Sequence, residues 1–230
     1  MPSEKTKKWP ELPWDEVVDR VVKSLYRVYA GQSAGTCFLV SLGLTHDKTH
    51  AYAIFATAWH VVKDMVDSTD DIQLVSADKQ KTFSSRTDLI SFAALGNSLY
   101  DTALIIAKTG DPIVSQSDLL PILPTDSMLA RGAEIGWLGF PGVVEPEPCF
   151  FHGYISGYLR NPPTYLVDGV AINGVSGGPA IDNRAHLIGL VSAYLPNRLD
   201  KTTTLPGMTA LIPINAIRYY MEHVLGADVL

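Results

Sequence analysis

The chain has 230 residues, of which 47% are hydrophobic and 18% are charged, and its net charge is −6. This length and apolar content allow one large core or two smaller ones and argue against disorder along the whole chain. The acidic balance disfavours nucleic acid as a partner, and no apolar run is long enough to favour a membrane partner.

The N-terminal segment is polar and leads into a short predicted helix. Lys5, Lys7 and Lys8 are followed by no apolar stretch, which is not the pattern of a secretory signal, so we expect a cytoplasmic location. Apolar residues then recur at helical spacing over 14–22, which predicts a helix packed on the body of the protein. We assign 1–23 to this tail and helix.

Short segments rich in β-branched and aromatic residues follow, separated by glycine or polar clusters. They lie at 24–30, 35–43, 50–58, 71–77, 81–87, 89–95 and 101–108. Many short strands with regular turn signals are typical of a β-sandwich or a β-barrel. We assign 24–115 to a first β unit.

A segment rich in Pro, Ser and Asp at 109–128 is the predicted linker to a second β unit at 116–214. Strand-like segments of that unit lie at 133–142, 150–159, 164–169, 185–195 and 208–214. The final stretch, 215–226, has an apolar stripe, a capping residue in Asn215 and a terminating glycine in Gly226, which predicts an amphipathic helix within 215–230.

The two cysteines and the histidines suggest no metal site. Cys37 and Cys149 are far apart in a chain that lacks a secretory signal, so we expect two reduced, buried thiols. No histidine motif or cysteine pair has the spacing of a metal site, so neither a metal nor another cofactor is implied.

Three local motifs could together supply a nucleophile. T-A-W-H ends at His60, D-T-A-L begins at Asp101, and G-V-S-G-G-P contains Ser176. A serine hydroxyl needs an imidazole to remove its proton, and a carboxylate to hold that imidazole in the right tautomer. Glycines beside the serine allow backbone amides to converge on an oxyanion, and we expect the amides of Gly174 and Ser176 to do so.

The type and order of these motifs resemble the signature of trypsin-like serine peptidases. The flanking segments A-G-T-C-F-L-V, I-G-W-L-G-F-P-G, F-H-G-Y-I-S-G and A-L-I-P-I-N-A-I resemble those of HtrA-type members. The resemblance implies an all-β chymotrypsin fold of two six-stranded antiparallel β-barrels, forming one peptidase domain with a short helix at each end. It also implies a serine endopeptidase that acts on protein or peptide substrates through His60, Asp101 and Ser176.

The resemblance further implies where a substrate would bind. Val170 matches the base of the primary pocket, where trypsin-like enzymes carry an acid, and Asn173 lies beside the pocket. Ser192, Ala193 and Tyr194 match the strand that pairs with an extended substrate, and Ser192 matches a serine that supports the catalytic carboxylate. We therefore expect cleavage after a small or medium apolar residue, with Tyr194 narrowing the pocket.

Some features depart from the best-known relatives. Val175 precedes the serine where zymogen-activated digestive enzymes carry an acid, so we do not expect activation by N-terminal cleavage. The family's disulfide framework is absent, and too few residues follow 226 for the PDZ domain of HtrA-type members. His152 is expected to be structural, and His186 to lie in a polar surface turn.

Two alternatives remain beside the protease. The serine segment also fits the G-x-S-x-G elbow of α/β-hydrolases, but that fold places its acid and histidine after the serine and alternates helices with strands. The second alternative is a catalytically inactive or latent trypsin-like domain that binds an extended peptide as an added strand. A regulatory partner is compatible with both an active and a latent domain, but no residue in the sequence identifies such a partner.

Overall fold

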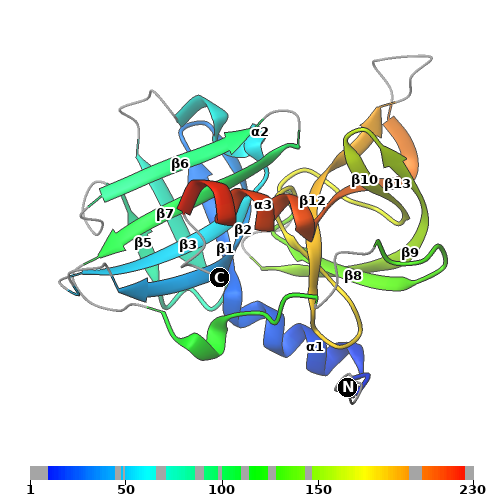
Figure 1. Ribbon diagram of the computed structural model, residues 1–230, viewed down its shortest axis with the longest axis horizontal. Helices are drawn as coiled ribbons and strands as arrows, with labels where there is room; N and C mark the ends of the chain where they lie inside the picture. Colours follow the sequence, from blue (N-terminus) through cyan, green and yellow to red (C-terminus); the bar gives the residue numbers. More distant parts are fainter. Residues whose placement is uncertain are drawn as a thin grey trace, which may run out of the picture.

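A computed structural model describes residues 10–44, 48, 50–65, 71–85, 91–97, 100–109, 114–123, 128–142, 147–196 and 204–225. Figure 1 shows two β units side by side, with α3 lying across them. Every strand pairing within the sheets is antiparallel. The predicted all-β class with a short helix near each end is therefore confirmed.

The first unit is a curled sheet of seven strands in the order β5-β4-β1-β2-β3-β7-β6. Its strands are β1 (Leu25–Ala30), β2 (Ser33–Leu44), β3 (Ala51–Thr57), β4 (Ile72–Ser76), β5 (Thr82–Ser84), β6 (Ser91–Asn97) and β7 (Thr102–Thr109). We predicted six strands closed into a barrel, whereas β5 and β6 are edges that pair with no further strand among the described residues.

Aromatic packing shows how strongly this sheet curls. Phe55 on β3 and Phe83 on β5 have ring centroids 6.4 Å apart, although three strands separate β3 from β5 in the sheet. Neighbouring strands are about 4.8 Å apart, so a flat sheet would keep these rings much farther from each other. Tyr26 packs against both rings, which places the core of this unit inside the curl.

The second unit is a closed barrel in the order β10-β13-β12-β11-β8-β9. Its strands are β8 (Glu134–Gly139), β9 (Cys149–Arg160), β10 (Pro163–Asp168), β11 (Pro179–Ile181), β12 (Leu187–Pro196) and β13 (Thr204–Pro213). Side chains at alternate positions point inward, and Trp137, Val167, Val191 and Leu211 are fully buried in the barrel core.

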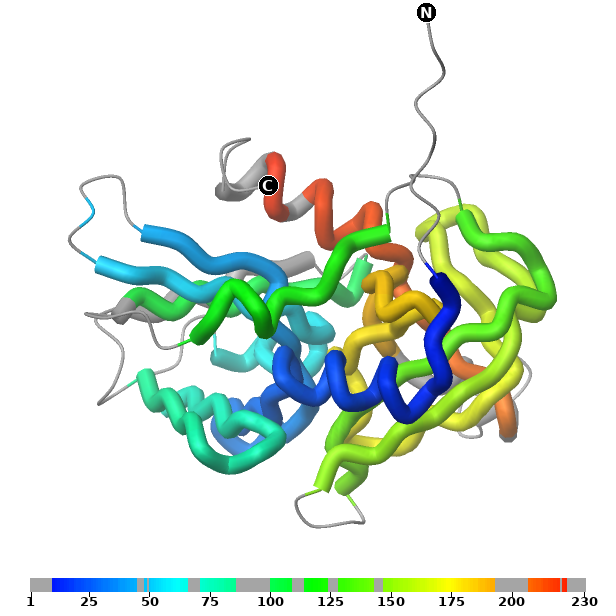
Figure 2. Tube along the Cα trace, turned by 90° about the horizontal axis from the view of Figure 1, so that it is seen from below, coloured from blue at the N-terminus to red at the C-terminus, as the bar shows by residue number. Residues whose placement is uncertain are grey.

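Two helices connect the units. In α1 (Trp14–Val21), Val17 and Val21 are buried in a hydrophobic cluster to which both units contribute, and Trp14 packs on Phe150 and donates to Glu134 of the second unit. Figure 2 shows α1 lying along the underside of both units. The predicted helix over 14–22 is confirmed within one residue.

The C-terminal helix α3 (Ile214–Leu225) leaves the barrel directly after β13. It buries Ile214, Ile217 and Met221 in a hydrophobic cluster that both units share, so the helix is amphipathic as its spacing predicted. None of the helices within the described parts of the chain combines the length and the apolarity needed to cross a membrane. Cys37 and Cys149 are both free thiols; Cys37 is fully buried as expected, whereas Cys149, at the start of β9, is only partly buried.

Candidate active site

His60 is presented by the short helix α2 (Trp59–Val62), which begins where β3 ends. Val61 and Val62 are buried, and Trp59 packs against the same core. This burial fixes the helix on the sheet and leaves the His60 side chain 42% exposed. The backbone amide of Trp59 donates to the Asp101 carbonyl oxygen at 3.1 Å.

Asp101 lies in the turn that opens β7, with a backbone φ of +44°. Aspartate tolerates this left-handed conformation better than most residues, because its short polar side chain can hydrogen-bond locally. Its carboxylate accepts three hydrogen bonds: from the His60 amide at 3.0 Å, from His60 Nδ1 at 2.9 Å, and from Ser192 Oγ at 2.5 Å. The two sequence-predicted residues and Ser192 thus form one hydrogen-bonded unit.

These contacts determine the charge state of Asp101. Burial works to raise the pKa of its carboxyl group, because a charged group loses solvation. The hydrogen bonds from His60 and Ser192 favour the ionised form and outweigh burial, so the pKa lies below its ordinary value of 3.8. The carboxylate is therefore charged at neutral pH.

Ser176 lies in a tight turn between β10 and β11. Gly174 and Gly177 in this turn have φ values of +93° and +85°. A Cβ on Gly177 would lie 2.2 Å from the Thr36 carbonyl oxygen and 2.3 Å from Thr57 Oγ1, so only glycine fits. This close approach brings the turn of the second unit against the end of β3 in the first.

The backbone amides of the serine turn fall into two groups. Those of Val175, Gly177 and Gly178 donate to carbonyl oxygens within the second unit, at 3.1, 2.7 and 3.0 Å. Those of Gly174 and Ser176 donate to no acceptor in the described part of the chain. These are the two amides that the sequence predicted for an oxyanion, and both are available for a ligand.

The segments that carry Ser176 and His60 meet near Gly35, but no hydrogen bond between the two side chains is present among the described residues. A Cβ on Gly35 would lie 2.8 Å from Val61, which follows His60, and 3.1 Å from the carbonyl oxygen of Ser176. No hydrogen bond joins the Ser176 hydroxyl to the imidazole among the described residues. The turn that carries Ser176 thus lies beside α2. Of the two hydrogen bonds expected in the triad, the one between Asp101 and His60 is present and the one between His60 and Ser176 is not.

The predicted substrate-binding residues occupy different surroundings. Val170 is 51% exposed, Asn173 is exposed, and Ser192 is buried. Ala193 and Tyr194 continue β12 and pair with β13, but their side chains lie outside the described part, and so does the predicted narrowing of the pocket by Tyr194.

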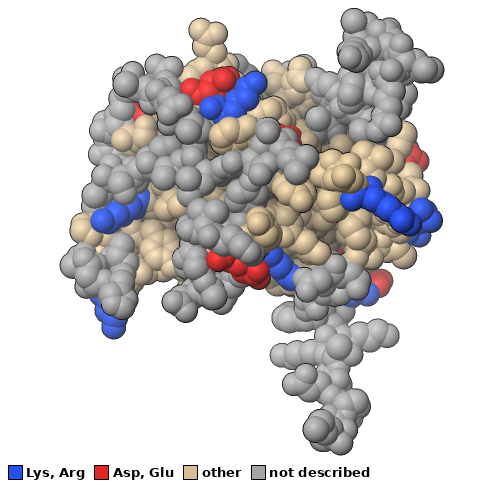
Figure 3. Space-filling model, turned by 45° about the horizontal axis from the view of Figure 1, so that its top comes forward, with Lys and Arg blue, Asp and Glu red and all other residues tan. Residues whose placement is uncertain are grey.

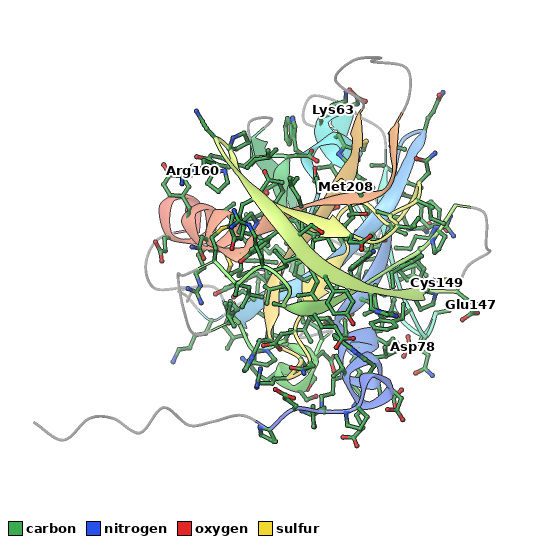
Figure 4. The ribbon with its side chains drawn as sticks, turned by 90° about the vertical axis from the view of Figure 1, so that its right-hand side faces the viewer. Lys63, Asp78, Glu147, Cys149, Arg160 and Met208 are labelled. Atoms are coloured by element: carbon green, nitrogen blue, oxygen red, sulfur yellow. The ribbon has the colours of Figure 1, made fainter. Side chains whose placement is uncertain are left out.

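A cavity of about 790 Å³ is lined by neither His60 nor Ser176. The described residues that line it include Tyr100, Met128, Tyr158, Arg160, Pro213 and Tyr219. Figure 4 shows Arg160 at the end of β9 opposite Cys149. The cavity approaches the hydrogen-bonded unit through Tyr100, the residue before Asp101, and it is not the predicted substrate pocket.

Charged side chains on the described surface are scattered over the face drawn in Figure 3. Some pair between distant parts of the chain, as in Lys79 with Glu147 at 2.9 Å and Arg184 with Glu11 at 2.6 Å. Within the described residues, no group of three or more His, Cys, Asp or Glu side chains could hold a metal ion.

The prediction that His186 lies in a surface turn is wrong. His186 is only 3% exposed, and its Nδ1 is 2.9 Å from Oδ2 of Asp182. Oδ1 of Asp182 accepts the amides of Arg184 and His186, so this carboxylate organises the turn from within. The polar sequence around His186 does not reveal that this turn is covered by the segment entering α1, where the Leu12 amide donates to the Asn183 carbonyl oxygen.

Sequence reasoning also missed Thr36. Its hydroxyl is within hydrogen-bonding distance of the serine turn and of the segment that follows β8. The sequence contains a weak signal, since Thr36 belongs to a glycine-containing segment that resembles HtrA-type members. Its partners, however, are backbone groups, which no motif reveals.

Comparisons with known proteins agree with this geometry. The family described as Trypsin-like peptidase domain matches residues 35–190, which is more than half of the chain and includes His60, Asp101 and Ser176. No curated protein matches the chain closely enough to count as a relative.

Solved structures share the fold at low sequence identity. The serine endoprotease from Yersinia pestis has a TM-score of 0.66 and 17% identity, over 96% of this chain and 69% of that one. The inactive form of a serine-to-alanine mutant of Rv3671c from M. tuberculosis has a TM-score of 0.62 and 16% identity, over 100% and 97%. The Rv3671c protease in its inactive form has a TM-score of 0.60 and 17% identity, over 89% and 90%.

Proposed function

Because the chain belongs to the trypsin-like peptidase family, we propose that it is a serine endopeptidase that uses Ser176 as nucleophile, His60 as general base and Asp101 as the carboxylate that orients the base. The observation that carries this proposal is the hydrogen-bonded unit of Asp101, His60 and Ser192. A carboxylate that accepts from Nδ1 of an imidazole leaves Nε2 as the basic nitrogen, which is the tautomer that a serine nucleophile requires.

The reaction follows from these contacts. His60 Nε2 takes the proton of Ser176 Oγ while the oxygen attacks the scissile carbonyl carbon, and the oxyanion accepts from the Gly174 and Ser176 amides. His60 then gives that proton to the leaving amine as the C–N bond breaks. Water repeats both steps on the ester, which releases the acid and restores the serine.

The missing Ser176–His60 hydrogen bond is compatible with this mechanism. Catalytic hydrogen bonds are often long or poorly aligned without substrate and shorten in the complex. Rotation about the Cα–Cβ bond of Ser176 moves its hydroxyl without moving the turn, whose backbone is held on both sides. We therefore expect this contact to form when a peptide is bound.

An extended peptide has an open strand edge to bind. The pairing of β11 with β12 reaches Leu190, and the Val191 amide then donates to Gly178 at 2.8 Å. Beyond Val191, β12 pairs only with β13 among the described residues, so its other edge offers backbone groups to a substrate strand. The exposed, uncharged Val170 favours an apolar residue at the cleavage position.

Cleavage of a peptide library tests both the activity and this preference. The wild type should cleave after small or medium apolar residues, and Ser176→Ala should lose at least about a thousandfold in kcat. Turnover near the wild-type rate in Ser176→Ala would contradict the assignment of the nucleophile. Fastest cleavage after arginine would contradict the predicted pocket while leaving the mechanism intact.

A second candidate is a latent domain that binds peptides without cutting them. The absence of a hydrogen bond between Ser176 and His60 in the described structure favours it. Such a domain would bind a fluorescent extended peptide with the same affinity in the wild type and in Ser176→Ala, and the peptide would remain intact in both.

A further inference from the structure

Thr36 connects the serine turn to a second segment of the barrel. It lies on β2 and is fully buried. Its Oγ1 donates to the carbonyl oxygen of Gly174 at 2.7 Å and accepts from the amide of Phe140 at 3.0 Å. Its own amide donates to the carbonyl oxygen of Ser176 at 2.9 Å. One residue of the first unit thus holds two carbonyls of the turn that carries the nucleophile.

The segment that begins at Phe140 closes a ring of hydrogen bonds and backbone, which we call the circuit. The Gly142 amide donates to the carbonyl oxygen of Asn173 at 2.7 Å. The circuit therefore runs from Thr36 to Phe140, along the chain to Gly142, across to Asn173, and through Gly174 back to Thr36.

This circuit sets the direction of one amide. In a trans peptide the C=O and the N–H point in opposite directions. Because the Asn173 carbonyl points at Gly142, the Gly174 N–H points away from Gly142 and has no acceptor among the described residues. The same peptide turned over would present a carbonyl oxygen where an amide is needed for the oxyanion.

The circuit is also tightly packed. A Cβ on Gly174 would lie 2.3 Å from the Phe140 carbonyl oxygen and 2.9 Å from the Gly142 nitrogen. A Cβ on Gly139 would lie 2.8 Å from Thr36 Oγ1. The Thr36 hydroxyl contacts both segments within this close packing.

We propose that Thr36 is a positioning residue for the oxyanion hole, and that its hydroxyl holds the Asn173–Gly174 peptide with the amide toward the substrate. This inference rests on the proposed function. Removing the hydroxyl leaves the Phe140 amide and the Gly174 carbonyl without their partner in a buried site. The Asn173–Gly174 peptide then populates orientations in which its amide no longer faces the oxyanion, and the stabilisation of the transition state falls.

The test compares Thr36→Val, which keeps the shape and loses the hydroxyl, with Thr36→Ser, which keeps the hydroxyl. We expect kcat to fall about tenfold to a hundredfold in Thr36→Val with KM within about twofold, and Thr36→Ser to stay within about threefold of the wild type. The inhibition constant of a peptide aldehyde, which forms a tetrahedral adduct, should rise in Thr36→Val by the factor lost in kcat/KM.

A matched control is Thr164→Val, which removes another buried hydroxyl, one that donates to the Pro162 carbonyl oxygen and not to the serine turn. It should leave kcat and the aldehyde affinity unchanged. If Thr36→Val does not fold, Thr36→Ala serves in its place, and failure of both to fold would overturn the proposal by making Thr36 a stability residue.

Other outcomes are equally decisive. A folded Thr36→Val with wild-type kcat and aldehyde affinity would overturn the positioning role while the wild type still cleaves peptides. A wild type that neither cleaves peptides nor binds the aldehyde would instead overturn the proposed function, and the positioning role with it.

Discussion

Ser192 Oγ donates to Asp101 Oδ2 at 2.5 Å, across the seam between the two β units. Asp101 opens β7 of the first unit, and Ser192 lies on β12 of the second. The charge that orients His60 is therefore held from both units at once. Separation of the units would break the hydrogen bond between Ser192 and Asp101, so the proposed mechanism depends on the relative position of the two units.

Replacement of Ser192 by alanine should weaken catalysis without abolishing it. The carboxylate loses one of three donors but keeps both hydrogen bonds from His60, so we expect kcat to fall about threefold to tenfold. Steady-state kinetics on a peptide substrate measure this loss. Ser24→Ala, which removes a buried hydroxyl bonded to Val21 far from the site, should have no effect on kcat.

The Asp101 carboxylate should make stability depend on acid pH. Its pKa is lower in the folded protein than its ordinary value, so folding favours the ionised form. This contribution is fully present above the unfolded pKa of about 4 and is lost as the pH falls through the lower folded pKa.

Denaturant unfolding of the wild type and of Asp101→Asn tests this dependence. The free energy of unfolding of the wild type should exceed that of Asp101→Asn at about pH 7, and the difference should shrink at about pH 2.5. A difference that is the same at both pH values would show that the charge of this carboxylate does not contribute.

The buried turn at Asp182 should matter for stability alone. Asp182→Ala removes the acceptor of two amides and the partner of the His186 ring, all of them buried or partly buried, and should cost about 2–3 kcal/mol in the free energy of unfolding. Asp182→Asn keeps a carbonyl oxygen for the amides and should cost less. The kcat per folded molecule should be unchanged in both, and a large loss of kcat would link this turn to the active site.

The longer elements were predictable from the sequence because their apolar patterns are long enough to have a period. The helix expected over 14–22 spans Trp14–Val21, and the one expected over 215–226 spans Ile214–Leu225. Short elements were missed because a few residues are too few to show a periodic pattern. β11 has three residues and α2 has four, with no side-chain cap at Ala58 to mark its start.

The predicted linker at 109–128 is only partly linker-like. Within its described part, the turn η3 (Gln116–Asp118) is closed by a capping box between Ser115 and Asp118, and Ile122 bridges to Leu187. The capping residues were visible in the sequence, but Pro, Ser and Asp are also the residues of an unstructured connection. Composition alone could not distinguish the two.

The candidate site also contains residues that the sequence could predict and residues that it could not. His60 and Asp101 could be paired from the sequence because each lies in a motif whose side chain the proposed mechanism uses, and Ser192 could be placed through the resemblance. Thr36 could not be linked to the turn, because its hydroxyl bonds to backbone groups of Phe140 and Gly174, which any residue carries. Such contacts are set by packing, which only the structure shows.

Reaction with a fluorophosphonate probe tests the central claim most directly, because the probe bonds covalently to a serine only when that serine is activated by its base and oxyanion donors. Mass spectrometry should locate a single adduct on Ser176 in the folded wild type, and none in Ser176→Ala or in wild type unfolded before labelling. Folded wild type that remains unlabelled, or an adduct on another residue, would contradict the account.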